Sequence, residues 1–282
     1  MRTYQKIRTN ATFADALLVG PSTASQPTVN SGFWGTFLSI CIGNNTIPDQ
    51  YTWHDEPGDP QNDVLQLYKL LATYGAPNRT ININEYGSTQ QQVSTGTAWF
   101  ISRLERFNAI GLRGNWLDGC HLYDFMANLL GKTNDNDCAG TGYFGNGEYQ
   151  VYKYYNQNMT GLRAQTTGTG DGVMDVYTTI GRDKVRTLTG VNLKQGTWYI
   201  TIQNLTAVGL PTSGSLSILT YGFIDNGTYG EVDGPTYRNT VSHPYSNNAI
   251  TFPVFQTAQD ANTAWAFEFD VVTNLCGLSK LK

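Results

Sequence analysis

Residues 12–162 alternate short apolar runs with amphipathic stretches of helical length, and this alternation constrains the fold more than any other feature of the chain. Because strands that alternate with helices form βαβ units, the pattern predicts a parallel sheet covered by helices. The runs expected as strands are residues 16–22, 50–56, 80–86 and 112–118. The stretches expected as helices are residues 33–42, 63–74, 91–110, 123–132 and 149–159.

The pattern changes after residue 162. Gly, Thr and short alternating runs then dominate, and no stretch of helical length is evident. The runs expected as strands are residues 174–179, 184–189, 197–203, 215–221 and 264–272. We therefore expect an α/β domain over residues 1–162, forming part of a TIM (β/α) barrel, and an antiparallel β-sandwich over residues 163–282.

The composition limits the class of ligand. Charged residues make up 14% of the chain, against about 25% in an average globular protein, and the net charge is only −4. This surface chemistry disfavours nucleic acid and an anionic membrane as partners, and no run approaches the roughly 20 apolar residues of a membrane span. Asn, Thr and Tyr favour a neutral, hydroxyl-rich ligand such as a saccharide.

Two features bear on the compartment. Asn-x-Thr sequons occur at Asn10, Asn44, Asn78, Asn158, Asn204 and Asn226, which favours a secreted glycoprotein. The first residues lack the apolar region of a signal peptide, so we expect a secreted product either to have lost its leader or to carry it upstream of Met1.

Four cysteines permit two disulfides: Cys41, Cys120, Cys138 and Cys276. Cys120 and Cys138 would close a short loop and are the favoured pair, and buried free thiols are the alternative. Only three histidines are present, none at ligand spacing to a cysteine, so we expect neither a metal site nor a cofactor.

The sharpest motif is the segment ININEYG, which places Asn84 and Glu85 at the end of an apolar strand. In α/β barrels, side chains at the carboxyl ends of the strands face the active site. A retaining glycosidase needs an ionised carboxylate there to attack the anomeric carbon. The alternative is a Glu on a surface loop or at a helix cap.

The neighbouring strands also end in polar and aromatic residues. The preceding strand ends with Trp53, His54 and Glu56, and the following strand ends with Asn115 and Trp116. Aromatic faces stack on sugar rings, and Asn and His bind hydroxyl groups. Three successive strand ends of this kind predict a lined pocket.

ININEYG, the helical WFISRLERF and the following GLRGNW together resemble the second half of a clan A retaining glycoside hydrolase. The similarity is to fungal proteins grouped with family 39, which includes β-xylosidases and iduronidases. The resemblance implies that the chain supplies the last four βα units of the barrel, followed by an accessory β-sandwich. It implies Glu85 as the nucleophile, with His54 beside the sugar and Trp116 beneath it.

Several roles remain open within this resemblance. Glu56 would bind a hydroxyl group or hold His54, and Asn84 and Asn115 would bind hydroxyl groups. His54 could instead be a structural histidine, Trp116 a packed residue of the barrel rim, and Trp53 could point outward to the helices.

The resemblance also implies a second carboxylate. This clan carries its general acid and base on the fourth strand, as Asn-Glu, and no such strand end precedes residue 80. The remaining carboxyl groups near strand ends are Asp55, Glu56 and Asp118.

The sequence thus predicts a retaining O-glycoside hydrolase, truncated at its N-terminus and lacking the acid/base residue, that acts on a glycoside or polysaccharide. The alternative is a non-catalytic carbohydrate-binding or scaffold protein. Four parallel strands leave two open sheet edges, which predicts edge-to-edge self-association.

Overall fold

The computed structural model describes residues 2–114, 125–134 and 137–272. The chain forms two compact units. The first consists of Met1–Ser88 and Arg103–Asn115, and the second of Thr89–Ser102 and Trp116–Lys282. The predicted domains 1–162 and 163–282 stay a prediction, because compactness does not show which segments fold independently.

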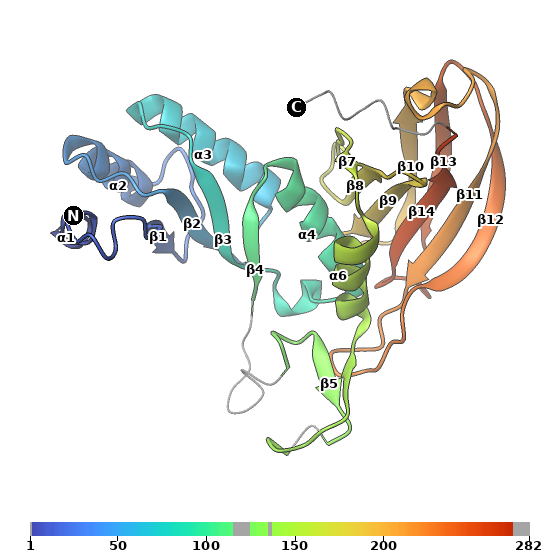
Figure 1. Ribbon diagram of the computed structural model, residues 1–282, viewed down its shortest axis with the longest axis horizontal. Helices are drawn as coiled ribbons and strands as arrows, with labels where there is room; N and C mark the ends of the chain where they lie inside the picture. Colours follow the sequence, from blue (N-terminus) through green and yellow to red (C-terminus); the bar gives the residue numbers. More distant parts are fainter. Residues whose placement is uncertain (1, 115–124, 135–136, 273–282) are drawn as a thin grey trace. The chain divides into compact units, whose positions relative to one another are not determined.

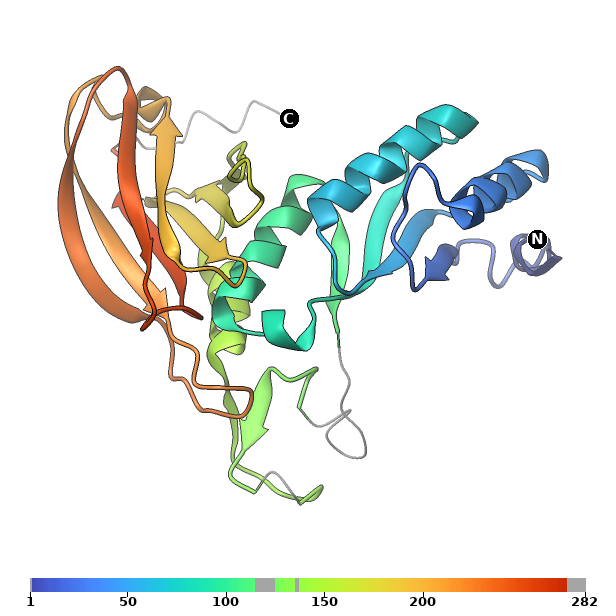
Figure 2. The same ribbon diagram turned by 180° about the vertical axis from the view of Figure 1, so that it is seen from behind.

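The first unit is built on a four-stranded sheet in the order β1-β2-β3-β4, and all neighbouring strands are parallel. This confirms the parallel sheet predicted from the βαβ alternation. Both views show α2 and α3 on the same face of this sheet (Figures 1 and 2). The elements are α1 (Arg2–Arg8), β1 (Val19–Thr23), α2 (Gly32–Gly43), β2 (Gln50–Asp55), α3 (Pro60–Tyr74), β3 (Thr80–Tyr86) and β4 (Ile110–Arg113).

Strand β4 begins and ends earlier than the predicted strand 112–118, whose last four residues lie outside the described residues. The reason is that the preceding helix, α4 (Ser94–Arg106), stops four residues before its predicted end at 110. Asn108 takes a left-handed φ of 50°, and the amide of Ala109 donates to the carbonyl of Leu104 (3.0 Å). This capped turn ends the helix, so that strand β4 begins at Ile110.

The second unit combines the first nine residues of α4 with three further helical segments among the described residues and with the β-rich region. Its elements are η1 (Thr89–Gln91), β5 (Leu130–Lys132), β6 (Tyr143–Gly145), α6 (Gly147–Asn158), β7 (Leu162–Arg163), β8 (Met174–Ile180), β9 (Lys184–Val191), β10 (Gly196–Gln203), η2 (Leu205–Val208), β11 (Gly214–Phe223), β12 (Thr236–Tyr245), β13 (Ala249–Gln256) and β14 (Ala264–Asp270). No helix among the described residues of the chain is long and apolar enough to cross a membrane.

The β-rich region is a sandwich of a six-stranded and a two-stranded antiparallel sheet. The larger sheet has the order β12-β11-β14-β9-β8-β7, and the smaller one pairs β10 with β13. Side chains alternate between two cores: Val176 faces the smaller sheet, whereas Tyr177 packs with the α4 and α6 residues Ala98 and Val151. Gly190 permits the second contact, because a Cβ there would lie 2.2 Å from the backbone nitrogen of Trp99.

The predicted helix 123–132 is wrong over its described part. Residues 125–129 form a turn, and residues 130–132 form β5, which pairs with β6. Met126, Ala127 and Asn128 have φ values of 47°, 54° and 65°. Three successive left-handed residues are incompatible with a right-handed helix.

Three strands of the sandwich were not predicted, namely the two-residue β7 and the longer β12 and β13. In β12 nearly every side chain is exposed, so the strand has no alternating apolar face to recognise. Strand β13 contains Pro253, which argues against a central strand. Pro253 is tolerated because β13 pairs only with β10 among the described residues, which leaves its other edge free of ladder hydrogen bonds.

Cys41 is a buried free thiol. Cys120 and Cys276 lie outside the described residues, so the favoured pairing of Cys120 with Cys138 stays a prediction.

Candidate active site

A bulge in β3 decides where the Glu85 carboxylate points. Trp53 pairs with Ile83, but the next residue on β2, His54, pairs with Glu85, so Asn84 is an extra residue in β3. Strict alternation would place Glu85 on the buried side with Ile83. The bulge instead aligns Glu85 with His54, in the way that bulges re-aim side chains beside active sites.

His54 and Glu85 form a close pair at the carboxyl ends of adjacent parallel strands. The Nδ1 atom of His54 lies 3.1 Å from Oε2 of Glu85, and the two side chains are 34% and 35% exposed. A carboxylate in this setting is accessible to a ligand, and the imidazole holds it in one orientation. The pair therefore offers a positioned nucleophile.

Glu56 adds a second carboxyl group to this pair. Burial, and after it the charge of Glu85, raise the pKa of Glu56 to about 7. Its Oε1 atom is buried and has no hydrogen-bond partner among the described residues, and the same holds for Oδ1 of Asn84. Two unsatisfied buried oxygens beside Glu85 suit a ligand that brings its own hydroxyl groups.

Trp53 does not join this group of residues. Its side chain is fully buried, and its ring meets that of Trp34 on α2 edge to face, with 6.1 Å between ring centroids. Of the two placements considered for Trp53, the structure shows the one that points to the helices. The other two predicted ligand contacts, Asn115 and Trp116, lie outside the described residues.

Behind the site lies a buried acidic group that the sequence did not indicate. Asp55 is fully buried, which removes it from the candidates for the second catalytic carboxyl group. Burial, and after it the neighbouring carboxyl group of Asp63, raise the pKa of Asp55 to about 9. Arg103, also fully buried, places its Nε atom 3.5 Å from Oδ1 of Asp59 at the start of α3.

Asp55 predicts a pH-dependent stability. Unfolded aspartate loses its proton near pH 3.9, whereas folded Asp55 holds it to about pH 9. The folded state therefore binds more protons between these values, and the free energy of unfolding falls as pH rises through this window. Asp55→Asn cannot ionise, so the loss of stability between pH 5 and pH 8 should be about 4 kcal/mol smaller in this variant than in the parent protein.

Thermal melting at both pH values measures this difference, with Asp15→Asn at an exposed position as the matched control. An equal loss of stability in the parent protein and in Asp55→Asn would contradict a neutral, buried Asp55.

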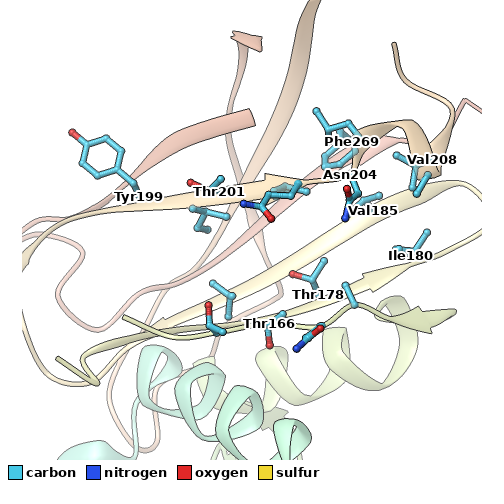
Figure 3. Close-up of a pocket in the computed structure, with 18 of the residues that line it drawn as sticks. Thr166, Thr178, Ile180, Val185, Tyr199, Thr201, Asn204, Val208 and Phe269 are labelled. Carbon is cyan, nitrogen blue, oxygen red and sulfur yellow. The ribbon is translucent and has the colours of Figure 1, made fainter. Parts of the chain in front are cut away.

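The second unit contains a groove of about 770 Å³ between the two sheets of the sandwich (Figure 3). Apolar residues of β8, β9 and β10 form much of its wall, including Val176, Val185 and Ile200. Among its described lining residues only Tyr199 carries an ionisable side chain. The groove therefore offers no acid–base chemistry, and the candidate active site is the His54–Glu85 pair.

Within the described residues, no three His, Cys, Asp or Glu side chains lie close enough together to hold a metal ion.

No protein-family model and no curated protein matches this chain. Several solved structures do match the chain. The protein N2152 from Neocallimastix frontalis superposes with a TM-score of 0.75 at 20% identity, over 95% of this chain and 63% of its own. A glucosidase from Croceicoccus marinus gives 0.56 at 12% identity, over 96% and 64%. A family 86 β-porphyranase from Bacteroides plebeius gives 0.59 at 13% identity, over 95% and 50%.

These similarities show the fold. The chain has a glycoside hydrolase-like fold, with a parallel sheet and antiparallel sheets that are consistent with part of a barrel and a β-sandwich. It spans about half to two thirds of the length of the structures that it matches.

Proposed function

We propose that this chain carries the nucleophile of a retaining O-glycoside hydrolase, with Glu85 as that nucleophile. The observation that supports this most directly is the His54–Glu85 pair, 3.1 Å apart and partly exposed at the ends of two parallel strands. The family 39-like resemblance of the ININEYG and GLRGNW segments supports the same role. His54 orients the carboxylate, and Asn84 and Glu56 bind hydroxyl groups of the sugar.

The proposed substrate is a neutral glycoside or polysaccharide. Its ring would stack on Trp116, with Asn115 beside it. Two of the structures that share the fold are a glucosidase and a β-porphyranase, and enzymes of both kinds act on carbohydrates. The buried, unpartnered oxygens of Glu56 and Asn84 match the hydroxyl groups of such a ligand.

Covalent labelling tests this proposal. The purified chain is incubated with a panel of 2-deoxy-2-fluoro glycosides that carry dinitrophenyl leaving groups, and intact mass is measured. These leaving groups depart without acid assistance, so the experiment reports on the nucleophile alone. We expect one adduct, mapped to Glu85 by peptide mass spectrometry and absent from Glu85→Gln.

A folded sample that forms no adduct with any sugar would overturn the proposed activity. Binding of the same sugars without an adduct would instead favour the alternative of a non-catalytic carbohydrate-binding protein.

Self-association is a further prediction, because the edge strands of the parallel sheet expose apolar side chains. Val19 on β1 is 49% exposed, and Ile110 and Leu112 on β4 are 50% and 60% exposed. Open edges of this kind pair with other chains. Light scattering should therefore show a mass that rises with concentration, and Leu112→Lys should reduce the rise.

The matched control for this prediction is Leu65→Lys, an exposed position on α3 away from both edges. A constant monomer mass over the whole concentration range would contradict edge pairing.

We propose that the protein is secreted and glycosylated. All six sequon asparagines are exposed: Asn10, Asn44, Asn78, Asn158, Asn204 and Asn226. When the chain is expressed behind a secretory leader in eukaryotic cells, treatment with an endoglycosidase should lower its mass by several glycans. An unchanged mass would contradict glycosylation.

A further inference from the structure

The two-stranded sheet of the sandwich has a groove along each of its strands. The groove beside β10 is the one in Figure 3, and a second groove of about 410 Å³ lies beside β13. The second groove is bounded by β11, β12 and β14 of the larger sheet and by β13 of the smaller one. Unlike the first groove, it contains an ion pair among its aromatic and amide side chains. Its lining includes Arg238, Asn239, His243, Phe252, Asp260 and Trp265.

A bulge in β12, the edge strand of the larger sheet (Figure 1), directs Arg238 into this groove. Asn239 pairs with Thr220, but the next pair joins Tyr237 to Tyr221, so Arg238 is an extra residue in β12. Strict alternation would place neighbouring residues on opposite faces of the strand, whereas both Arg238 and Asn239 line the groove. The bulge therefore places a cation and an amide in the same groove.

The guanidinium of Arg238 is held in a fixed position. Its Nη2 atom donates to Oδ1 of Asp260 (2.9 Å), and its Cζ atom lies 5.5 Å from the centroid of the Trp265 ring. Gly222 makes room for it, because a Cβ there would lie 2.7 Å from Nε of Arg238. A side chain fixed in this way loses little further conformational entropy when it binds a ligand.

Gln256 fixes the other half of the ion pair. Its side chain is buried, and its Nε2 atom donates to the carbonyls of Asp260 (2.6 Å), Ala261 (3.0 Å) and Thr263 (3.0 Å). Its Oε1 atom accepts from the indole nitrogen of Trp265 (2.8 Å). One buried amide therefore holds both the loop that carries Asp260 and the aromatic ring against which the guanidinium lies.

The charges of the groove favour a neutral ligand. Asp260 neutralises Arg238, and no further Lys, Arg, Asp or Glu side chain is among the described residues that line the groove. The two side chains are 33% and 23% exposed, so the guanidinium still offers N–H donors and the carboxylate still offers an acceptor oxygen. This arrangement suits neighbouring hydroxyl groups better than a phosphate or carboxylate, because Asp260 repels an anion.

The open edge of β13 argues against a peptide strand as the ligand. No strand among the described residues pairs with this edge, and Pro253 lies in the middle of β13. Because proline has no N–H, an added strand would lack a ladder hydrogen bond there. The groove also presents the apolar side chains of Val241 and Phe252. Apolar walls with a few fixed polar groups suit a sugar, which has C–H faces as well as hydroxyl groups.

We propose that this groove is a saccharide-binding site of the second unit. Arg238 and Asp260 bind neighbouring hydroxyl groups of a neutral sugar, and Asn239 binds a further hydroxyl group. The sugar ring lies against the apolar wall. This site goes beyond the proposed function, and it binds saccharide without any chemistry at Glu85.

Affinity electrophoresis tests this site. The full chain is run in native gels that contain one of four neutral polysaccharides: arabinoxylan, xyloglucan, mixed-linkage β-glucan or galactan. We expect at least one of them to retard the parent protein and Glu85→Gln alike. The dissociation constant, measured from the dependence on polysaccharide concentration, should rise at least about tenfold in Arg238→Ala and severalfold in Asn239→Ala.

The matched control is Thr240→Ala, which should bind like the parent protein. Thr240 follows Asn239 on β12 and is exposed, but it is not among the residues that line the groove. Thermal melting shows whether each variant is folded. The exposed position of Asn239 keeps the test informative even if Arg238→Ala unfolds.

The outcomes separate this site from the proposed function. A folded parent protein that no gel retards, or a dissociation constant that is unchanged in both folded variants, would overturn the saccharide site. A parent protein that is retarded through Arg238 and Asn239 but forms no adduct at Glu85 would support the saccharide site and fail the proposed function. An adduct at Glu85 without retardation in any gel would do the reverse.

Discussion

Replacing Glu85 with glutamine should lower kcat/KM by at least about 10³-fold, whatever the leaving group. The amide has nearly the same shape as the carboxylate and still offers an oxygen to Nδ1 of His54, 3.1 Å from the original oxygen. It lacks the negative charge that attacks the anomeric carbon. The loss should therefore appear in catalysis, with thermal stability close to that of the parent protein.

The independence from the leaving group separates a nucleophile from a general acid. A missing acid matters less when the leaving oxygen is already a good leaving group, whereas a missing nucleophile matters for every substrate. Glu231→Gln is the control for a conservative change at an exposed glutamate. Activity of Glu85→Gln within about tenfold of the parent would contradict the role of nucleophile.

A variant that removes the whole side chain of Glu85 adds a stereochemical test. In Glu85→Gly, azide would occupy the space of the carboxylate and displace the leaving group directly, in one step. One displacement inverts the anomeric centre, whereas two displacements retain it. An inverted glycosyl azide from Glu85→Gly would therefore assign the role of nucleophile to Glu85 from product configuration alone.

Strand β3 shows what the sequence predicted well. The alternation of Ile81 and Ile83 with two asparagines predicted a strand over residues 80–86, and the structure has β3 at the same residues. The apolar period and the polar strand end are both local signals, so no distant contact was needed to recognise them.

The direction of the Glu85 side chain could not be predicted from the local sequence. It depends on the extra residue at Asn84, and a bulge is defined by the register with the neighbouring strand. The same limit applies to Asp55. The sequence does not distinguish Asp55 from the other carboxyl groups at strand ends. Only the packing of Asp63 against Asp55 shows that Asp55 is buried and neutral.

Glu56 lies between these cases. Its position at a polar strand end marked it as a candidate contact for the sugar. Its raised pKa comes from burial and from the charge of Glu85 on β3, and neither cause can be recognised from the sequence alone. The functional residues of this chain are therefore recognised by type from the sequence and separated by role only from the fold.

Trp53 provides the largest expected effect on stability. Its fully buried ring packs edge to face against Trp34, so Trp53→Ala removes a large apolar group and leaves a cavity. Such truncations cost about 3–5 kcal/mol. The indole nitrogen has no hydrogen-bond partner among the described residues, so Trp53→Phe loses no hydrogen bond and should cost clearly less than Trp53→Ala.

The pair of substitutions distinguishes a core residue from a sugar platform. If Trp53 supports the core, Trp53→Phe lowers the melting temperature and leaves KM and the labelling of Glu85 nearly unchanged. Phe33→Ala, at a 56% exposed position on α2, should cost less than about 0.5 kcal/mol and serves as the control. A Trp53→Phe variant with unchanged stability and a KM raised severalfold would instead place this ring against the substrate.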